Sequence, residues 1–138
     1  MQRITTSVAL VFAGALLLSG CAAGGGGGST ADACETVRSE VRDVSNGAQN
    51  SLAAGGDPAE IQSALEGYSE RVTTLGETAP DAVSTALEGL SAALDDAAEF
   101  AATLPEDPEA EVDADAVAEQ QTAIQEAAVE VSTACAAD

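Results

Sequence analysis

The stretch VSTALEGLSAALDDAAEFAATL, residues 83–104, decides the fold class of this chain. Its apolar residues recur alternately four and three positions apart, which places them on one face of a helix. That face comprises Val83, Leu87, Leu90, Leu94, Ala97, Ala101 and Leu104. Residues 78–81 precede it as a helix start, and Pro105 predicts the helix end.

Three further segments repeat this helical spacing. Their apolar faces are Cys34, Val37, Val41, Val44, Ala48 and Leu52; Ile61, Leu65, Tyr68, Val72 and Leu75; and Val117, Gln121, Ile124, Ala128, Val131 and Cys135. No segment shows the two-residue alternation of a strand. The sequence therefore predicts an all-α domain, a small antiparallel up-down-up-down four-helix bundle.

Capping residues mark the predicted helix boundaries. Asp32 is the expected N-cap of the first helix, and Asp57 followed by Pro58 starts the second. Glycines at positions 55, 56 and 76 end these two helices. Before the last helix lies an acidic link, residues 105–115, whose like charges predict a mobile or partly helical loop. An alternative is a three-helix core with this link and the fourth helix loosely docked.

The N-terminus predicts a secretory signal peptide. Arg3 gives it a positive start, and residues 8–18 form an apolar run. That run is shorter than the roughly 20 apolar residues of a membrane-spanning helix. Residues 1–20 are therefore expected to be removed.

The run ends in Leu18-Ser19-Gly20-Cys21, which resembles the lipobox of bacterial lipoprotein precursors. The resemblance implies that a diacylglyceryl group is attached to the Cys21 thiol and that the chain is cut between Gly20 and Cys21. Lipid attached to Cys21 would hold the protein on the cell membrane, on its extracytoplasmic face. An ordinary secretory signal with a coincidental cysteine is the alternative.

The Gly-rich segment after the lipobox predicts a flexible tether over residues 21–30, with the helical domain at 31–138. The Ala-, Asp- and Glu-rich, Lys-free composition is similar to that of small lipoproteins of high-GC Gram-positive bacteria. A salt-adapted organism would show the same bias, and a Gram-negative periplasm fits as well.

Lipidation of Cys21 leaves Cys34 and Cys135, in a chain bound for an oxidising compartment. We expect a disulfide between these two, because the bundle topology brings both to one end. A reactive thiol is the competing interpretation. It would need a nearby base, and the chain has no His and no Lys.

The net charge of −20 argues against binding to nucleic acid. No catalytic constellation, metal site or cofactor site is expected, because His is absent and no carboxylate pair stands out. The sequence thus predicts a noncatalytic envelope lipoprotein, a helical interaction or accessory module with an unknown envelope protein partner. Tyr68 and Phe100 are either core residues or part of a docking face. The alternative function is binding of a small ligand in a bundle cavity, or of calcium on the acidic link.

Overall fold

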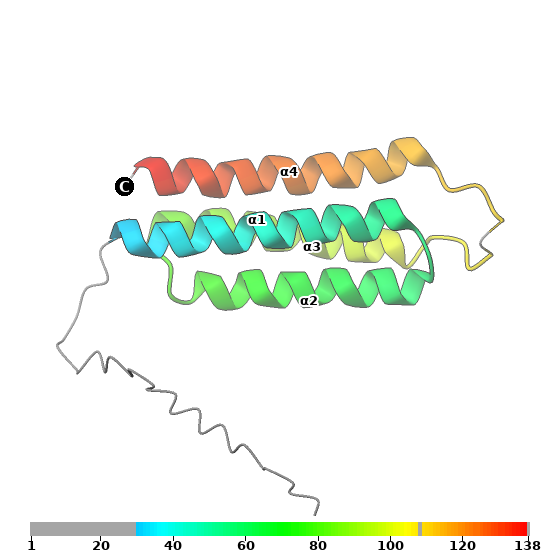
Figure 1. The fold of residues 1–138 in the computed structure, drawn as a ribbon, viewed down its shortest axis with the longest axis horizontal. Helices are drawn as coiled ribbons and strands as arrows, with labels where there is room; N and C mark the ends of the chain where they lie inside the picture. The colour runs from blue at the N-terminus through cyan, green and yellow to red at the C-terminus, as the bar shows by residue number, and fades with distance from the viewer. Residues whose placement is uncertain (1–29, 108, 138) are drawn as a thin grey trace, which may run out of the picture.

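The computed structural model describes residues 30–107 and 109–137, which form four α-helices without a strand. The helices are α1 (Thr30–Ala54), α2 (Pro58–Gly76), α3 (Asp81–Ala101) and α4 (Ala114–Ala137). Figure 1 shows them side by side with alternating directions. The predicted all-α class and antiparallel four-helix bundle are confirmed.

Each helix packs against two neighbours, in the ring order α1, α2, α3, α4 and back to α1. Because α4 contacts both α1 and α3, it belongs to the bundle and is not loosely docked. The bundle has two distinct ends (Figure 1). We call the left end in Figure 1 the near end; it holds Thr30, Ala137 and the α2–α3 turn. The right end, called the far end, holds the α1–α2 turn and the α3–α4 loop.

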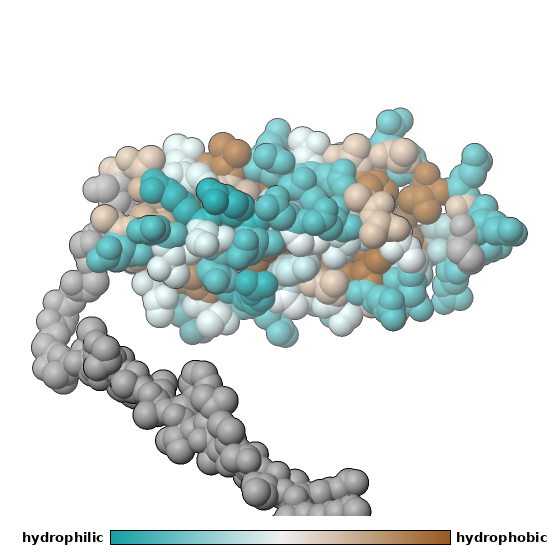
Figure 2. Space-filling model, viewed as in Figure 1, coloured by the Kyte–Doolittle hydropathy of each residue, from teal (hydrophilic) through white to brown (hydrophobic). Residues whose placement is uncertain are grey.

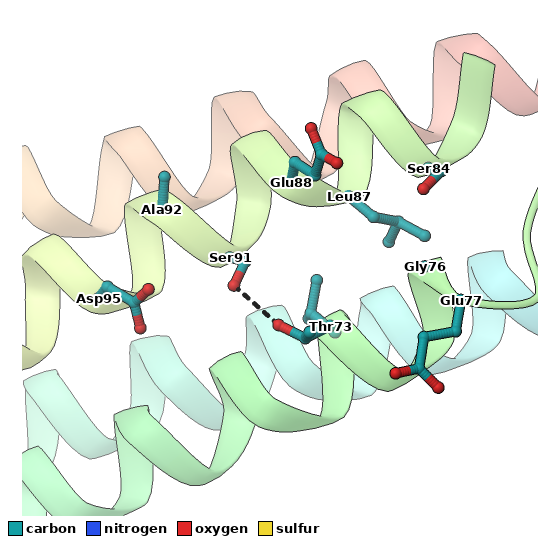
Figure 3. A pocket seen from close by; sticks show the side chains of 10 residues that line it. Thr73, Gly76, Glu77, Ser84, Leu87, Glu88, Ser91, Ala92 and Asp95 are labelled. Atoms are coloured by element: carbon teal, nitrogen blue, oxygen red, sulfur yellow. Dashed lines mark hydrogen bonds between the residues drawn. The ribbon is translucent and has the colours of Figure 1, made fainter. Parts of the chain in front are cut away.

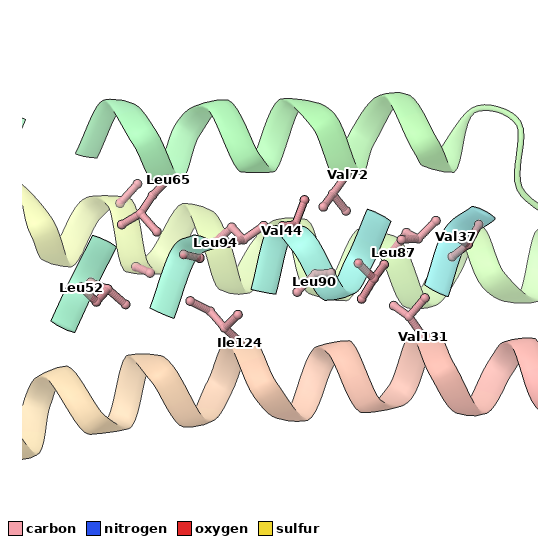
Figure 4. Packing of buried hydrophobic residues seen from close by; sticks show 14 of the residues in the cluster. Val37, Val44, Leu52, Leu65, Val72, Leu87, Leu90, Leu94, Ile124 and Val131 are labelled. Carbon is pink, nitrogen blue, oxygen red and sulfur yellow. The ribbon is translucent and has the colours of Figure 1, made fainter. Parts of the chain in front are cut away.

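The core consists of the apolar faces that the spacing predicts. All six residues of the α1 face are buried, and so is the α3 face from Val83 to Ala101. In Figure 4, Leu65, Leu90, Leu94 and Ile124 point from the helices into the shared interior. Burial of these large side chains supplies most of the stabilising free energy of such a bundle.

Tyr68 and Phe100, the two aromatic residues of the domain, are partly buried and packed against the core. Tyr68 lies against Gly47 of α1. A Cβ atom at Gly47 would lie only 2.6 Å from Tyr68 Cζ, so the missing side chain makes room for the ring. Both aromatic residues therefore belong to the packing of the bundle.

Polar residues on the helix faces pair with one another. The hydroxyls of Ser69 in α2 and Ser91 in α3 lie 2.8 Å apart. Gln121, predicted on the α4 face, donates from Nε2 to the backbone oxygen of Gln49 in α1 at 3.1 Å. Gln121 therefore connects α4 to α1 by a hydrogen bond in place of an apolar contact.

The boundaries of α2 confirm the expected capping. Asp57 Oδ1 accepts a hydrogen bond from the backbone N–H of Ala59 at 2.8 Å, and Pro58 is the first helical residue. Gly55 and Gly56, which separate α1 from α2, have φ angles of 65° and 122°. L-residues rarely adopt these values, so the glycines allow the sharp reversal of the chain.

Three predicted boundaries were wrong. The first helix begins at Thr30, so Asp32 lies inside its first turn and is not the N-cap, and Thr30 is not part of the tether. The helix α3 ends at Ala101, and Leu104 lies in the turn that follows. Asp115, assigned to the acidic link, lies in the first turn of α4.

Candidate functional site

Cys34 and Cys135 lie together at the near end, as the topology predicts. Both are buried, at 3% and 6% exposure, and the structure carries both as thiols. Cys135 Sγ lies 3.9 Å from the backbone oxygen of Cys34. The second turn of α1 and the last turn of α4 bring these residues together. Gly20 and Cys21, where the sequence predicts cleavage and lipidation, lie outside the residues that the structure describes.

A first surface hollow, the α2–α3 groove, has a volume of about 410 Å³. Its floor is formed by the buried side chains of Val72 and Leu87, and its walls carry hydroxyls and carboxylates. Across it, the hydroxyls of Thr73 and Ser91 lie 3.2 Å apart (Figure 3). These hydroxyls already have partners in each other.

The carboxylates of the α2–α3 groove are spread along it. Figure 3 shows Glu77 and Asp95 toward opposite ends, with Glu88 on the wall. No cationic side chain lines the groove. The arrangement contains no nucleophile with an adjacent base, since its hydroxyls lie beside other hydroxyls and none is hydrogen-bonded to a carboxylate among the described residues.

A second hollow, the end pocket, lies at the far end and has a volume of about 360 Å³. Its main side chains are Leu52, Ile61, Leu104, Val112, Val117 and Gln121. They come from all of α1, α2 and α4 and from the α3–α4 loop. Gln121 is the one polar side chain in the lining, and its Nε2 is already bonded to Gln49.

The end pocket exposes apolar surface to solvent. Val112 is 45% exposed, one of two large hydrophobic residues in the described chain that are so exposed; the other is Val129 on α4, at 55%. Figure 2 shows hydrophobic atoms, in brown, gathered at this end beside the hydrophilic atoms of the α3–α4 loop. The end pocket therefore combines a recessed apolar lining with a half-exposed apolar side chain at its edge.

The α3–α4 loop is held by its own hydrogen bonds. Asp107 Oδ1 accepts from the N–H of Glu109 at 2.9 Å. Asp113 Oδ1 accepts from the N–H groups of Asp115 at 3.0 Å and Ala116 at 3.3 Å, which makes Asp113 the N-cap of α4. Over residues 30–107 and 109–137, no group of three or more His, Cys, Asp or Glu side chains is arranged to hold a metal ion.

The basic residues of the domain lie away from this loop. Arg71 forms an ion pair with Glu40 at 2.7 Å, and both side chains are about half exposed. Arg38 and Arg42 lie in the half of α1 that starts at the near end. The part of the chain that surrounds the end pocket thus contains carboxylates and no cation.

None of the helices that the structure describes is long and apolar enough to cross a membrane. No protein-family model, no curated protein and no solved structure matches this chain. The sequence did not predict the end pocket or the contact between Gly47 and Tyr68. The only signal for the pocket was Val112, an apolar residue within an acidic link.

Proposed function

We propose that this chain is a noncatalytic envelope lipoprotein, anchored through lipid on Cys21, whose bundle is an interaction module for another envelope protein. Cleavage between Gly20 and Cys21 would leave a tether that leads into α1 at the near end. The extracytoplasmic face of the cell membrane is the location that this anchoring implies.

The observation that carries the interaction role is the position of the end pocket. Thr30, where the helical domain begins, and the end pocket lie at opposite ends of the bundle. A domain tethered at its near end therefore leaves the half-exposed Val112 and its apolar neighbours at the opposite end, accessible to a partner. A concave, largely apolar hollow of this size is the usual candidate for a binding site.

We also propose that Cys34 and Cys135 form a disulfide in the mature protein. Their burial at one end, with Cys135 Sγ 3.9 Å from the Cys34 backbone oxygen, supports this pairing. Oxidation would pass two electrons and two protons to the thiol-oxidising system of the compartment. The bond would connect the first and last helices at the near end of the bundle.

Anchoring is tested by growing cells with an alkyne-tagged fatty acid and analysing the purified protein by mass spectrometry. We expect the tag on a peptide that begins at Cys21, with residues 1–20 absent. Cys21→Ser should abolish labelling, whereas Cys34→Ser, the matched control, should retain it. Labelling that persists in Cys21→Ser would contradict the lipobox assignment.

The interaction role is tested by photo-crosslinking in intact cells. A photoreactive amino acid is placed at position 112 in the end pocket, at position 88 in the α2–α3 groove, or at position 129 on α4. We expect a discrete crosslinked product from at least one position. Absence of any product at all three positions would contradict an interaction module.

A further inference from the structure

We propose that the end pocket is a docking site for a positively charged segment of a partner protein, which inserts one apolar side chain between α1, α2 and α4. This inference rests on the proposed interaction role and adds the chemistry of the partner. The occupant follows from two independent features, the apolar lining of the pocket and the charge around it.

The lining selects an apolar group. Leu52 and Ile61, 4% and 5% exposed, form the base, while Val112 stands at the rim. The volume of about 360 Å³ is large enough to take one large apolar side chain. Gln121, which donates from Nε2 to Gln49, is the one polar side chain of the lining, and the other lining side chains are apolar.

The surroundings of the pocket select positive charge. Four carboxylates are covalent neighbours of lining residues: Glu106 follows Pro105, Glu111 and Asp113 flank Val112, and Asp115 follows Ala114. All four are exposed. A cationic segment would reduce the repulsion between these charges, an effect that acts over a Debye length of about 8 Å in physiological salt.

Over residues 30–107 and 109–137, the chain supplies no cation to the lining of the end pocket. Its described arginines are Arg38, Arg42 and Arg71, and Arg71 is already paired with Glu40. None of the three lines the end pocket. The carboxylates of residues 106–115 extend over a loop, so they match a segment carrying several Lys or Arg residues better than a small amphiphile with one charge.

Binding is tested with three synthetic peptides of equal length and the purified domain, residues 22–138. The first peptide is rich in lysine and arginine and has a single central leucine. The second has serine in place of the leucine, and the third has glutamate in place of each basic residue. Fluorescence anisotropy measures each affinity at low and at physiological salt.

We expect the first peptide to bind and the glutamate peptide to show no binding. Loss of the leucine should weaken binding about tenfold, as removal of one buried apolar side chain does. Equal affinity of the leucine and serine peptides would overturn the proposal, because it would indicate nonspecific attraction to an acidic protein. Binding of the leucine peptide that is insensitive to salt would overturn the charge argument.

Variants of the protein locate the binding site. Val112→Ser should weaken binding of the leucine peptide roughly fivefold to tenfold, because it removes half-exposed apolar surface at the rim. Val129→Ser, at the other exposed valine, is the matched control and should leave the affinity unchanged. Equal effects of the two substitutions would overturn the assignment to the end pocket.

The charge contribution is located in the same way. Replacement of Glu106 and Glu111 together by glutamine should reduce the salt dependence of binding, whereas the same change at Glu126 and Glu130 on α4 should not. The photo-crosslinking in cells separates this proposal from the interaction role. A crosslink at position 88 or 129 with none at position 112 would refute the docking site and leave the interaction role intact.

Discussion

Replacing Gly47 by alanine should destabilise the bundle, although alanine is the better helix former. Gly47 lies in the interior of α1, where Gly→Ala on its own contributes about 0.5–1 kcal/mol of stability. The new Cβ, however, would lie 2.6 Å from Tyr68 Cζ, well inside van der Waals contact. Overpacking of this kind costs about 1–3 kcal/mol, because the Tyr68 ring, which packs against the core, must shift away from α1.

The two effects oppose each other, and the clash is the larger. We expect a net loss of about 1 kcal/mol, which lowers the melting temperature by roughly 4–8 °C. Urea unfolding followed by far-UV circular dichroism measures the free energy of unfolding. A companion thermal scan gives the melting temperature.

Two other helical glycines provide matched controls. No atom lies within 4 Å of a Cβ built at Gly67 or at Gly89. Gly67→Ala and Gly89→Ala should therefore show the propensity gain alone, about 0.5–1 kcal/mol. If Gly47→Ala stabilised the protein as much as these two do, the Gly47–Tyr68 contact would be refuted.

A double-mutant cycle isolates the contact. In a Tyr68→Ala background the obstacle is gone, so Gly47→Ala should change from destabilising to stabilising. The coupling between positions 47 and 68 should then be about 1–3 kcal/mol. A coupling near zero would mean that the cost of Gly47→Ala comes from another source.

Three further outcomes follow from the fold. The oxidised mature protein should titrate no thiol at Cys34 or Cys135 after unfolding, and two titratable thiols would disprove the disulfide. Dithiothreitol should lower the protein's free energy of unfolding by about 4–5 kcal/mol, as expected for a loop of this length. Ile124→Ala should lower the free energy of unfolding in urea by about 2–5 kcal/mol, because that side chain is fully buried. Val129→Ala, at an exposed position of the same helix, should change it by less than about 0.5 kcal/mol. Similar losses for the two variants would contradict the orientation of α4. Gly55→Ala should lower the free energy of unfolding by about 1 kcal/mol, because the φ angle of Gly55 is 65° and alanine rarely adopts it. A neutral result in urea unfolding would argue against the turn between α1 and α2.

The apolar faces of the helices could be predicted from the sequence because each buried face repeats along its own helix. Leu87 and Leu94 in α3, and Ile124 in α4, can be assigned to the core from the apolar spacing within their own helix, without knowing which helix packs against it. The position of Cys34 beside Cys135 was likewise predictable, since an even number of antiparallel helices returns the chain to its starting end.

The helix ends could not be predicted from the apolar spacing, because local hydrogen bonds, a proline and a capping side chain determine them. After Ala101 the backbone turns more tightly, with Thr103 N–H donating to the Phe100 oxygen at 2.9 Å and Leu104 N–H to the Ala101 oxygen at 3.1 Å. Pro105 disfavours a helical conformation of Leu104, so the apolar spacing continues to Leu104 although the helix ends at Ala101. At the start of α4, Asp113 caps the helix and draws Asp115 into its first turn.

The end pocket and the close approach of α1 to α2 could not be predicted from single segments. Gly47 and Tyr68 are 21 positions apart, and nothing in either helix alone indicates that they meet. Leu52 and Val117 come together only through the ring order of the helices. Such features depend on how the helices are rotated and offset against one another.

The meeting of Thr30 and Ala137 at one end has a consequence for how the molecule can be rearranged. Domains with adjacent termini tolerate circular permutation. A permutant that joins these two ends by a short linker and opens the chain within residues 102–113 would keep the four helices and their order in the ring. Its new N-terminus would emerge at the far end. A lipid anchor fused there would attach the bundle by its far end and leave the two cysteines at the end opposite the anchor.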